Sequence, residues 1–457
     1  MAESISSIPA IRLQTIVWGV QNMALTYKAV RVGTVCAVAL WFGASARAAE
    51  PGGAAETGGR NGLSWVGTWA AAPQPFIPGS LETYHNQSIR LIIHTSMAGS
   101  MVRIKISNLF GDRPLRIGGA HIARRASAAD IDSTTDRTLR FAGRLSTTVP
   151  PRSVAVSDPV RIAVPALSDL AVSIFLPTAT AATTSHFLAQ QVSYVSPETG
   201  DSTAAVKFPV AKTITSWPFL TGVDVMAPPH ASVIVAFGDS TVDGDGITPD
   251  SNHRWPDILA VRLQDGGGPA AGVLNEGLIG NRLLHDSPDE VAKQFGAALG
   301  QAGIARFARD ALGQAGVHCV IVRLGINDIG FPGALTPAAT QVTAEQLVVG
   351  YRQLISEARK KGIRIVGTTL SPFEGAEVFP RYYTAEKEAV RQEINAWIRR
   401  SGEFDAVIDL DAVLRDPGHP SRLLPDYDSG DHLHTNDVGY AAAAKAIPLE
   451  LLQLGLG

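Results

Sequence analysis

The stretch that most constrains the fold is an apolar run at residues 233–237, which ends in Gly-Asp-Ser-Thr at residues 238–241. The run is short, continuous and rich in β-branched residues, which is typical of a strand buried in a parallel sheet. A loop at residues 242–246 and a helical pattern over residues 254–263 follow it. The pattern therefore predicts that Ser240 lies at the C-terminal end of a buried strand, where open α/β sheets bind ligands. Gly-Asp-Ser tripeptides are common, so this stretch alone is better explained by an ordinary strand-to-loop turn than by catalysis.

From residue 232 onward, strand patterns alternate with helix patterns. Beyond the first strand and its helix, we predict strands at residues 272–275, 318–324, 364–370 and 406–410, and helices at residues 302–312, 344–360, 385–400 and 436–452. This order implies right-handed crossovers and a parallel sheet that helices cover on both faces. Functional side chains are then expected where strands end and loops begin.

Residues 65–216 follow a different pattern, with short strands and no helix-like periodicity between them. Strand patterns at residues 88–94, 101–106 and 169–176 are separated by turn signals such as Pro150-Pro151. This spacing predicts an antiparallel β-sandwich of jelly-roll type.

The first 48 residues have the features of an export signal. Lys28 and Arg31 precede an apolar segment at residues 32–43, and Ala46-Arg47-Ala48 has the small-residue spacing after which signal peptidase cleaves. A membrane-spanning helix needs about 20 apolar residues, so this shorter segment predicts no stable membrane insertion. Met23 stands just before the segment, and residues upstream of it are either an extension or a misassigned start. We therefore expect a bacterial protein that is secreted or periplasmic.

Together these patterns divide the chain into four predicted segments. They are a signal peptide at residues 1–48, a linker at 49–62, an N-terminal β-sandwich domain at 63–229, and a catalytic α/β domain at 230–457.

The composition argues against a disordered chain and against nucleic acid as a partner. Hydrophobic residues make up 45% and charged residues 18% of the 457 residues, which is typical of a globular protein. The formal net charge is −3 with both signs interspersed, whereas nucleic-acid binding calls for a basic stripe. Cys36 would leave with the signal and Cys319 lies in an apolar run, so no disulfide is expected in the mature chain.

Five residues lie where the predicted strands end or where the last helix begins: Ser240, Gly280, Asn327, Asp431 and His434. A serine hydroxyl becomes a nucleophile when an imidazole takes its proton and a carboxylate holds that imidazole in the right tautomer. We therefore predict Ser240 as nucleophile, His434 as base and Asp431 as the group that orients the base. The amides of Ser240 and Gly280 and the side-chain NH2 of Asn327 are the predicted oxyanion hole.

Each of these residues also has a structural explanation. Gly280 fits an ordinary turn, Asn327 and Asp431 fit caps of strands or helices, and His434 fits a surface histidine. Neighbouring residues that we interpret as structural rather than catalytic are Asp239, Trp255, Asn275, Asp328 and His432.

In combination, the four blocks resemble the SGNH/GDSL hydrolase superfamily, which carries serine, glycine, asparagine and histidine in this order. The blocks are Gly238-Asp239-Ser240-Thr241, with threonine in place of the usual leucine, the glycine block at Gly280, Gly325-Ile326-Asn327-Asp328, and Asp431-His432-Leu433-His434. The resemblance implies a flavodoxin-like three-layer α/β/α domain with a five-stranded sheet and no metal or organic cofactor. Residues 281–284 (Asn-Arg-Leu-Leu) and 65–70 (Trp-Val-Gly-Thr-Trp-Ala) are similar to the xylan-esterase-like bacterial branch.

The predicted function is that of an exported serine esterase that removes short acyl groups, acetyl foremost, from small-molecule or polysaccharide esters through an acyl-enzyme on Ser240. The same site would serve a lipase or lysophospholipase, a thioesterase or an arylesterase. A non-catalytic carbohydrate-binding protein is a different class, and the complete set of five residues argues against it. A metal-dependent phosphoesterase would need His and Asp clusters at metal-ligand spacing, and no such cluster accompanies Ser240 in the sequence. The Gly-x-Ser-x-Gly elbow of α/β-hydrolases is absent, because residue 242 is valine.

Overall fold

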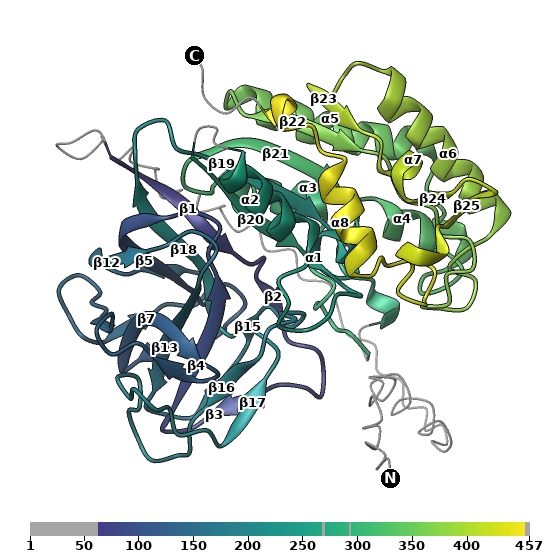
Figure 1. Cartoon of the computed structure of the whole chain (residues 1–457). Helices are drawn as coiled ribbons and strands as arrows, with labels where there is room; N and C mark the ends of the chain where they lie inside the picture. Colours follow the sequence, from purple (N-terminus) through teal and green to yellow (C-terminus); the bar gives the residue numbers. More distant parts are fainter. Residues whose placement is uncertain (1–62, 267–269, 292–293, 453–457) are drawn as a thin grey trace, which may run out of the picture. The chain divides into compact units, whose positions relative to one another are not determined.

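The computed structural model describes residues 63–266, 270–291 and 294–452 (Figure 1). The predicted signal peptide and the predicted linker lie outside these residues. Within the described ranges, no helix combines the length and the apolar character that crossing a membrane requires.

Up to Ala227, the described elements are strands that pair antiparallel (Figure 1). One sheet has the order β1 (Ser64–Ala70), β18 (Leu220–Ala227), β5 (Gly99–Ser107) and β11 (Val154–Val156), with β12 (Val160–Val164) also paired to β5. The other has the order β17 (Lys212–Ile214), β16 (Ser193–Val195), β4 (Gln87–His94), β13 (Asp169–Leu176), β7 (Gly119–Ser127) and β8 (Asp130–Ile131), with β9 (Arg137–Thr138) on β7. Short pairs are β2 (Gln74–Pro75) with β15 (Thr184–Ser185), β3 (Thr83–Tyr84) with β14 (Thr180–Ala181), and β6 (Leu115–Ile117) with β10 (Thr147–Val149).

Side chains from both larger sheets share one apolar core. Strand β5 shows the period of two that places alternate residues on one face: Val102, Ile104 and Ile106 are fully buried. They belong to the same apolar cluster as Leu91 of β4 and Val172 of β13 in the other sheet. Burial of these side chains against one another holds the two sheets together.

From Ser232 onward, strands and helices alternate around a five-stranded parallel sheet. Its order is β20 (Ala271–Gly277), β19 (Ser232–Gly238), β21 (Val317–Arg323), β22 (Arg364–Thr368) and β23 (Ala406–Ile408). The helices are α1 (Ser240–Asp243), α2 (Trp255–Asp265), α3 (Gly303–Asp310), α4 (Ile326–Gly330), α5 (Ala344–Lys360), α6 (Ala385–Arg400), α7 (Leu410–Leu414) and α8 (Asp437–Lys445). Four 3₁₀ turns, η1 (Asp289–Val291), η2 (Ala338–Thr340), η3 (Pro425–Tyr427) and η4 (Leu449–Leu452), and a hairpin, β24 (Arg415–Asp416) with β25 (His419–Leu423), complete the described part.

Strand β19 is buried along its whole length, and its two faces contact different helices. Val235 and Phe237 belong to a cluster that also holds side chains of α3, α5 and α6. Ile234 and Ala236 belong to a second cluster, with side chains of α2, α7 and α8. This burial on both faces explains why the strand is continuously apolar.

Two predicted boundaries differ from the structure near the C-terminus. The last helix was expected over residues 436–452 but ends at Lys445, because Pro448 lacks an amide hydrogen and disfavours helical backbone before it. Only the short turn η4 follows. The fifth strand ends at Ile408 rather than at residue 410, because the Asp409 side chain accepts from the amide of Ala412 and starts α7.

We call the strands up to Ala227 the β half and the elements from Ser232 onward the α/β half. The two halves pack directly against each other, and the described residues form one compact unit. The amide of Gly67 in β1 donates to the carbonyl of Ala315 at 2.9 Å, and Ser96 Oγ accepts from the amide of Val273 in β20 at 3.0 Å. A Cβ on Gly272 would lie 2.6 Å from the carbonyl oxygen of Gly67, so the backbones meet where a side chain would not fit.

Candidate active site

Ser240 begins the single helical turn α1, directly after strand β19. Asp239 caps this turn, because its Oδ1 accepts from the amide of Thr241 at 3.0 Å and from its hydroxyl at 2.7 Å. A Cβ on Gly238 would lie 2.1 Å from the carbonyl oxygen of Arg323 on the neighbouring strand. Glycine and aspartate before the serine therefore serve the tight strand-to-helix turn, and the serine side chain is left for chemistry.

The loop before α8 brings a histidine and an aspartate to this serine. His434 Nε2 lies 2.7 Å from Ser240 Oγ, and His434 Nδ1 lies 2.5 Å from Asp431 Oδ2. Asp431 Oδ1 accepts from the backbone amides of Leu433 and His434, at 3.0 and 2.8 Å. The carboxylate thus folds its own loop and orients the imidazole at the same time, which is the arrangement of a serine–histidine–aspartate triad.

The charge state of His434 is set by carboxylates around it. Burial by itself lowers the pKa of this imidazole, but Asp245, Asp431 and Asp239 outweigh burial and raise the pKa of His434 to about 9. Asp245 Oδ2 lies 3.7 Å from Nε2. For Asp431, burial raises the pKa, yet the His434 ring and the hydrogen bonds from the loop amides hold it well below its usual range. Asp431 therefore stays ionised, and His434 accepts a proton readily.

The loop after β20 carries Gly280 with a φ of +71°, a left-handed conformation that glycine adopts without strain. The amide of Leu278 donates to the carbonyl of Gly238 at 3.1 Å, which ties this loop to the end of β19. A Cβ on Gly280 would lie 2.6 Å from Leu299 Cδ2. In the described part of the chain, the amides of Gly280 and Ser240 donate no hydrogen bond to another protein group.

Asn327, in the short helix α4, lies against the same loop. Its Nδ2 donates to the carbonyl of Asn281 at 2.9 Å, and its Oδ1 accepts from the hydroxyl of Tyr382 at 2.8 Å. The two contacts fix the amide group and leave the second Nδ2 hydrogen for a further acceptor. Asn327 therefore contacts the loop that carries Gly280, and that loop is bonded to the end of β19, the strand that precedes Ser240.

The residues interpreted as structural make structural contacts. Asp328 accepts from the amides of Leu283 and Leu284 at 2.6 and 3.0 Å, and burial raises its pKa to about 6. Asn275 donates to the carbonyl of Val242 at 2.8 Å. His432 lies at the surface and pairs with Asp428, and Trp255 is buried in the cluster beside α2.

Three residues at or near the site were missed at the level of sequence. Asp245 lies in the loop after Ser240, and the excess of acidic residues in that loop was the available signal. Tyr382 reaches Asn327 from the segment before α6, and His186 reaches the turn after Ser240 from the β half. Neither has a local sequence signal, because both act across more than fifty residues of chain. Among the residues whose positions are described, no group of three His, Cys, Asp or Glu side chains is arranged to hold a metal ion.

Solved structures similar to this chain include several esterases. An aryl esterase of M. smegmatis is 16% identical, and the match covers 49% of this chain and 100% of that chain with a TM-score of 0.37. A carbohydrate acetylesterase family member from Sinorhizobium meliloti is 21% identical, with coverages of 49% and 100% and a TM-score of 0.36. A GDSL-like lipase from Bacteroides thetaiotaomicron VPI-5482 is 16% identical, with coverages of 48% and 87% and a TM-score of 0.33. No curated protein matches the chain.

Residues 236–442 match the model of the GDSL-like Lipase/Acylhydrolase family. The matched range begins in β19 just before Ser240 and includes Gly280, Asn327, Asp431 and His434. The chain therefore contains a GDSL-like lipase/acylhydrolase domain of the SGNH superfamily, and the protein is a carboxylic ester hydrolase.

Proposed function

We propose that Ser240 is the nucleophile of this hydrolase and that the reaction passes through an acyl-enzyme. The observation that carries the proposal is the continuous chain from Ser240 Oγ to His434 Nε2 at 2.7 Å and from His434 Nδ1 to Asp431 Oδ2 at 2.5 Å. His434 takes the serine proton as Oγ attacks the ester carbonyl, and then gives it to the leaving alcohol. Water repeats the sequence in the deacylation half of the cycle, and Asp431 stabilises the imidazolium in both halves.

The amides of Ser240 and Gly280 and the Nδ2 of Asn327 serve as the donors to the oxyanion. Each donor of this kind typically contributes about 2.7–4 kcal/mol to the transition state. The open amides and the fixed orientation of Asn327 support these roles. A preorganised donor costs nothing to reorient as negative charge develops on the carbonyl oxygen.

We further propose that the enzyme is exported and acts on short acyl esters, acetyl foremost, of carbohydrates. The export signal predicted at residues 1–48 supports the location. The sequence beyond that signal has no long apolar stretch that would form a lipid-binding lid. Membership of the xylan-esterase-like branch remains a prediction from the short strings at residues 65–70 and 281–284.

We also propose the predicted domain layout: a β-sandwich at residues 63–229 and a flavodoxin-like three-layer α/β/α domain at 230–457. Two antiparallel sheets with a shared core support the former. The sheet order β20-β19-β21-β22-β23 and the helices in separate clusters on the two faces of β19 support the latter.

One set of assays tests the reaction and the substrate class together. Release of p-nitrophenol from acetate, butyrate and octanoate esters is measured beside release of acetate from acetylated xylan. Ser240→Ala should abolish both activities, whereas the control Ser251→Ala, which changes an exposed serine in the following loop, should leave both unchanged. Retention of more than about a hundredth of the activity in Ser240→Ala would refute the nucleophile. Octanoate turnover above acetate turnover, with no acetate from xylan, would replace the carbohydrate esterase with a lipase or arylesterase.

A further inference from the structure

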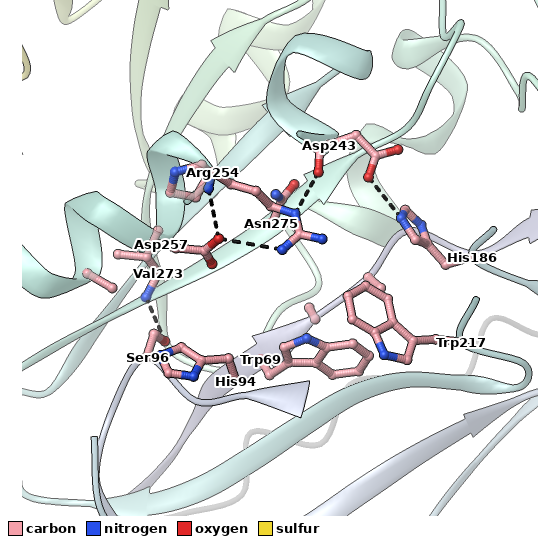
Figure 2. A pocket seen from close by; sticks show the side chains of 14 residues that line it. Trp69, His94, Ser96, His186, Trp217, Asp243, Arg254, Asp257, Val273 and Asn275 are labelled. Carbon is pink, nitrogen blue, oxygen red and sulfur yellow. Dashed lines mark hydrogen bonds and ion pairs between the residues drawn. The ribbon is translucent and has the colours of Figure 1, made fainter. Parts of the chain in front are cut away.

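A second histidine–aspartate pair lies buried where the β half meets the turn that carries Ser240. His186, which follows β15, places Nε2 2.9 Å from Asp243 Oδ1, and both side chains are less than 5% exposed (Figure 2). His186 Nδ1 lies 2.9 Å from the carbonyl oxygen of Ala72. A carbonyl and a carboxylate are both acceptors, so each ring nitrogen carries a hydrogen and the ring is an imidazolium.

The second oxygen of the same carboxylate reaches the loop that carries Gly280. Asp243 Oδ2 accepts from the backbone amide of Ile279 at 2.9 Å. Ile279 directly precedes Gly280, and Asp243 is the last residue of the turn α1 that begins at Ser240. One carboxylate thus connects the nucleophile turn, the oxyanion loop and the β half of the molecule.

The surroundings leave this carboxylate little freedom. A Cβ on Gly277 would lie 2.1 Å from the amide nitrogen of Asp243, and Arg254 Nε donates to the Asp243 carbonyl at 2.7 Å. The His186 ring lies 5.6 Å from the ring of Trp217, whose indole packs edge-on against Trp69 (Figure 2). Without His186, Asp243 Oδ1 would face this cavity without its hydrogen-bond partner, and the carboxylate could turn toward Arg254 and away from the loop.

The cavity beside this pair is too small for an organic ligand. Its volume is about 30 Å³, which is room for one or two water molecules. Trp69, Trp217, Arg254 and Asp257 line it together with the pair. Polar groups around the cavity pair with one another, so the His186–Asp243 pair has a structural rather than a ligand-binding role.

We propose that His186 is a positioning residue for the oxyanion hole. By pairing with Asp243 it holds that carboxylate in the rotamer that binds the Ile279 amide, and this fixes the direction of the Gly280 N–H. The inference rests on the proposed role of Gly280 as an oxyanion donor. It gives the β half a part in catalysis: the half supplies a residue that acts through Asp243 on the reaction centre.

The kinetic test compares His186→Ala and His186→Gln with the control His94→Gln. His94 pairs with Asp169 at 2.7 Å within the β half and lines the same cavity, so it tests a histidine–aspartate pair that does not include Asp243. With p-nitrophenyl acetate, His186→Ala should lower kcat about 100-fold, because a misplacement of about 1 Å has an effect of that size. KM should stay within about twofold, His186→Gln should recover part of kcat through its side-chain NH2, and His94→Gln should match the wild type. An equal loss in His94→Gln, or a rise in KM with kcat unchanged, would overturn the proposal.

A double-mutant comparison and amide exchange separate this proposal from the proposed function. If His186 acts through Asp243, adding His186→Ala to Asp243→Asn should lower kcat no further, whereas multiplied losses would contradict the proposal. Hydrogen exchange at the Ile279 amide needs no turnover: His186→Ala should speed it at least tenfold, His186→Gln should speed it less, and His94→Gln should leave it unchanged. Unchanged exchange in His186→Ala refutes the positioning role even if esters are hydrolysed. Absence of any ester hydrolysis in the wild type refutes the proposed function, while the exchange result still decides about His186.

Discussion

Two pairs, His434–Asp431 and His186–Asp243, each join an imidazole to a carboxylate. They differ in the group that lies against the second nitrogen of the imidazole ring. In the first pair that nitrogen meets the hydroxyl of Ser240, which both donates and accepts hydrogen bonds. In the second it meets the carbonyl of Ala72, which only accepts. A proton can therefore leave and return at His434, whereas the ring of His186 is held in one state. The partner of the second nitrogen, rather than the pair itself, separates a group suited to catalysis from one suited to structure.

The largest expected effect is the loss of activity in His434→Gln. The variant removes the base, so kcat for p-nitrophenyl acetate should fall by at least 10⁴-fold, since removal of a triad histidine costs up to about 10⁶. The same substitution at His186 should cost about 100-fold or less. Circular dichroism checks that both variants fold. If the two variants lost activity equally, the distinction between the pairs would be wrong.

Next in size is the effect of Asp431→Asn, which should lower kcat about 10⁴-fold. The amide would donate to Nδ1 and force the proton onto Nε2, where it blocks transfer from Ser240. The matched control is Asp428→Asn, because Asp428 pairs with the half-exposed His432 two residues away from the triad histidine. This control should keep kcat within about twofold. A large loss of kcat in Asp428→Asn would mean that the base role had been given to the wrong histidine.

The free energy of unfolding should rank the two histidines in the opposite order, with the larger loss at His186. His186→Ala leaves Asp243 buried without its partner, so the free energy of unfolding should fall by about 3 kcal/mol. His434→Ala should lower it less, because Asp431 is about a third exposed and keeps its hydrogen bonds from two loop amides. Urea denaturation of both variants provides the measurement. A larger loss in His434→Ala would show that the buried interface pair contributes little to folding.

The smallest expected effect is a shift of the pH profile. His434 must be neutral to take the serine proton, and its pKa is raised to about 9, so kcat/KM should climb with pH toward that value. Asp245→Asn removes the carboxylate that raises this pKa most, so the acid limb should move to lower pH and activity at pH 7 should increase. The control Asp250→Asn changes an acidic residue that bonds to Gln191 and should leave the limb in place. An unmoved limb in Asp245→Asn would mean that Asp245 does not control the imidazole.

Local sequence patterns were sufficient for the elements that surround the proposed triad. The alternation of strands and helices predicted helices α5 and α6 at their observed bounds, since capping threonines and apolar periodicity both lie within the segment. The five proposed site residues were predicted because each follows a predicted strand or precedes the last predicted helix, and parallel strands bring such ends to one edge of a sheet.

Contacts between distant segments were not predictable in this way. His186 lies in a region of short strands, and nothing in its neighbours indicates that it faces Asp243 rather than solvent. The pairing depends on how the β half packs against β20, which is decided by close backbone contacts such as that between Gly67 and Gly272. Single-sequence periodicity describes one element at a time and carries no information about such packing.

The hydroxyl of Tyr382 and the carbonyl of Asn281 together fix which edge of the Asn327 amide, proposed as an oxyanion donor, stays unpaired. Burial raises the pKa of this phenol well above its ordinary value, so it remains a hydrogen-bond donor, and Asn327 Oδ1 is its acceptor. A flipped amide would set acceptor against acceptor at the carbonyl of Asn281 and would leave the Tyr382 hydrogen without its acceptor. The open edge of Asn327 is therefore always the positive one, and a carbonyl oxygen that gains negative charge meets the same polarity at every pH at which the fold persists.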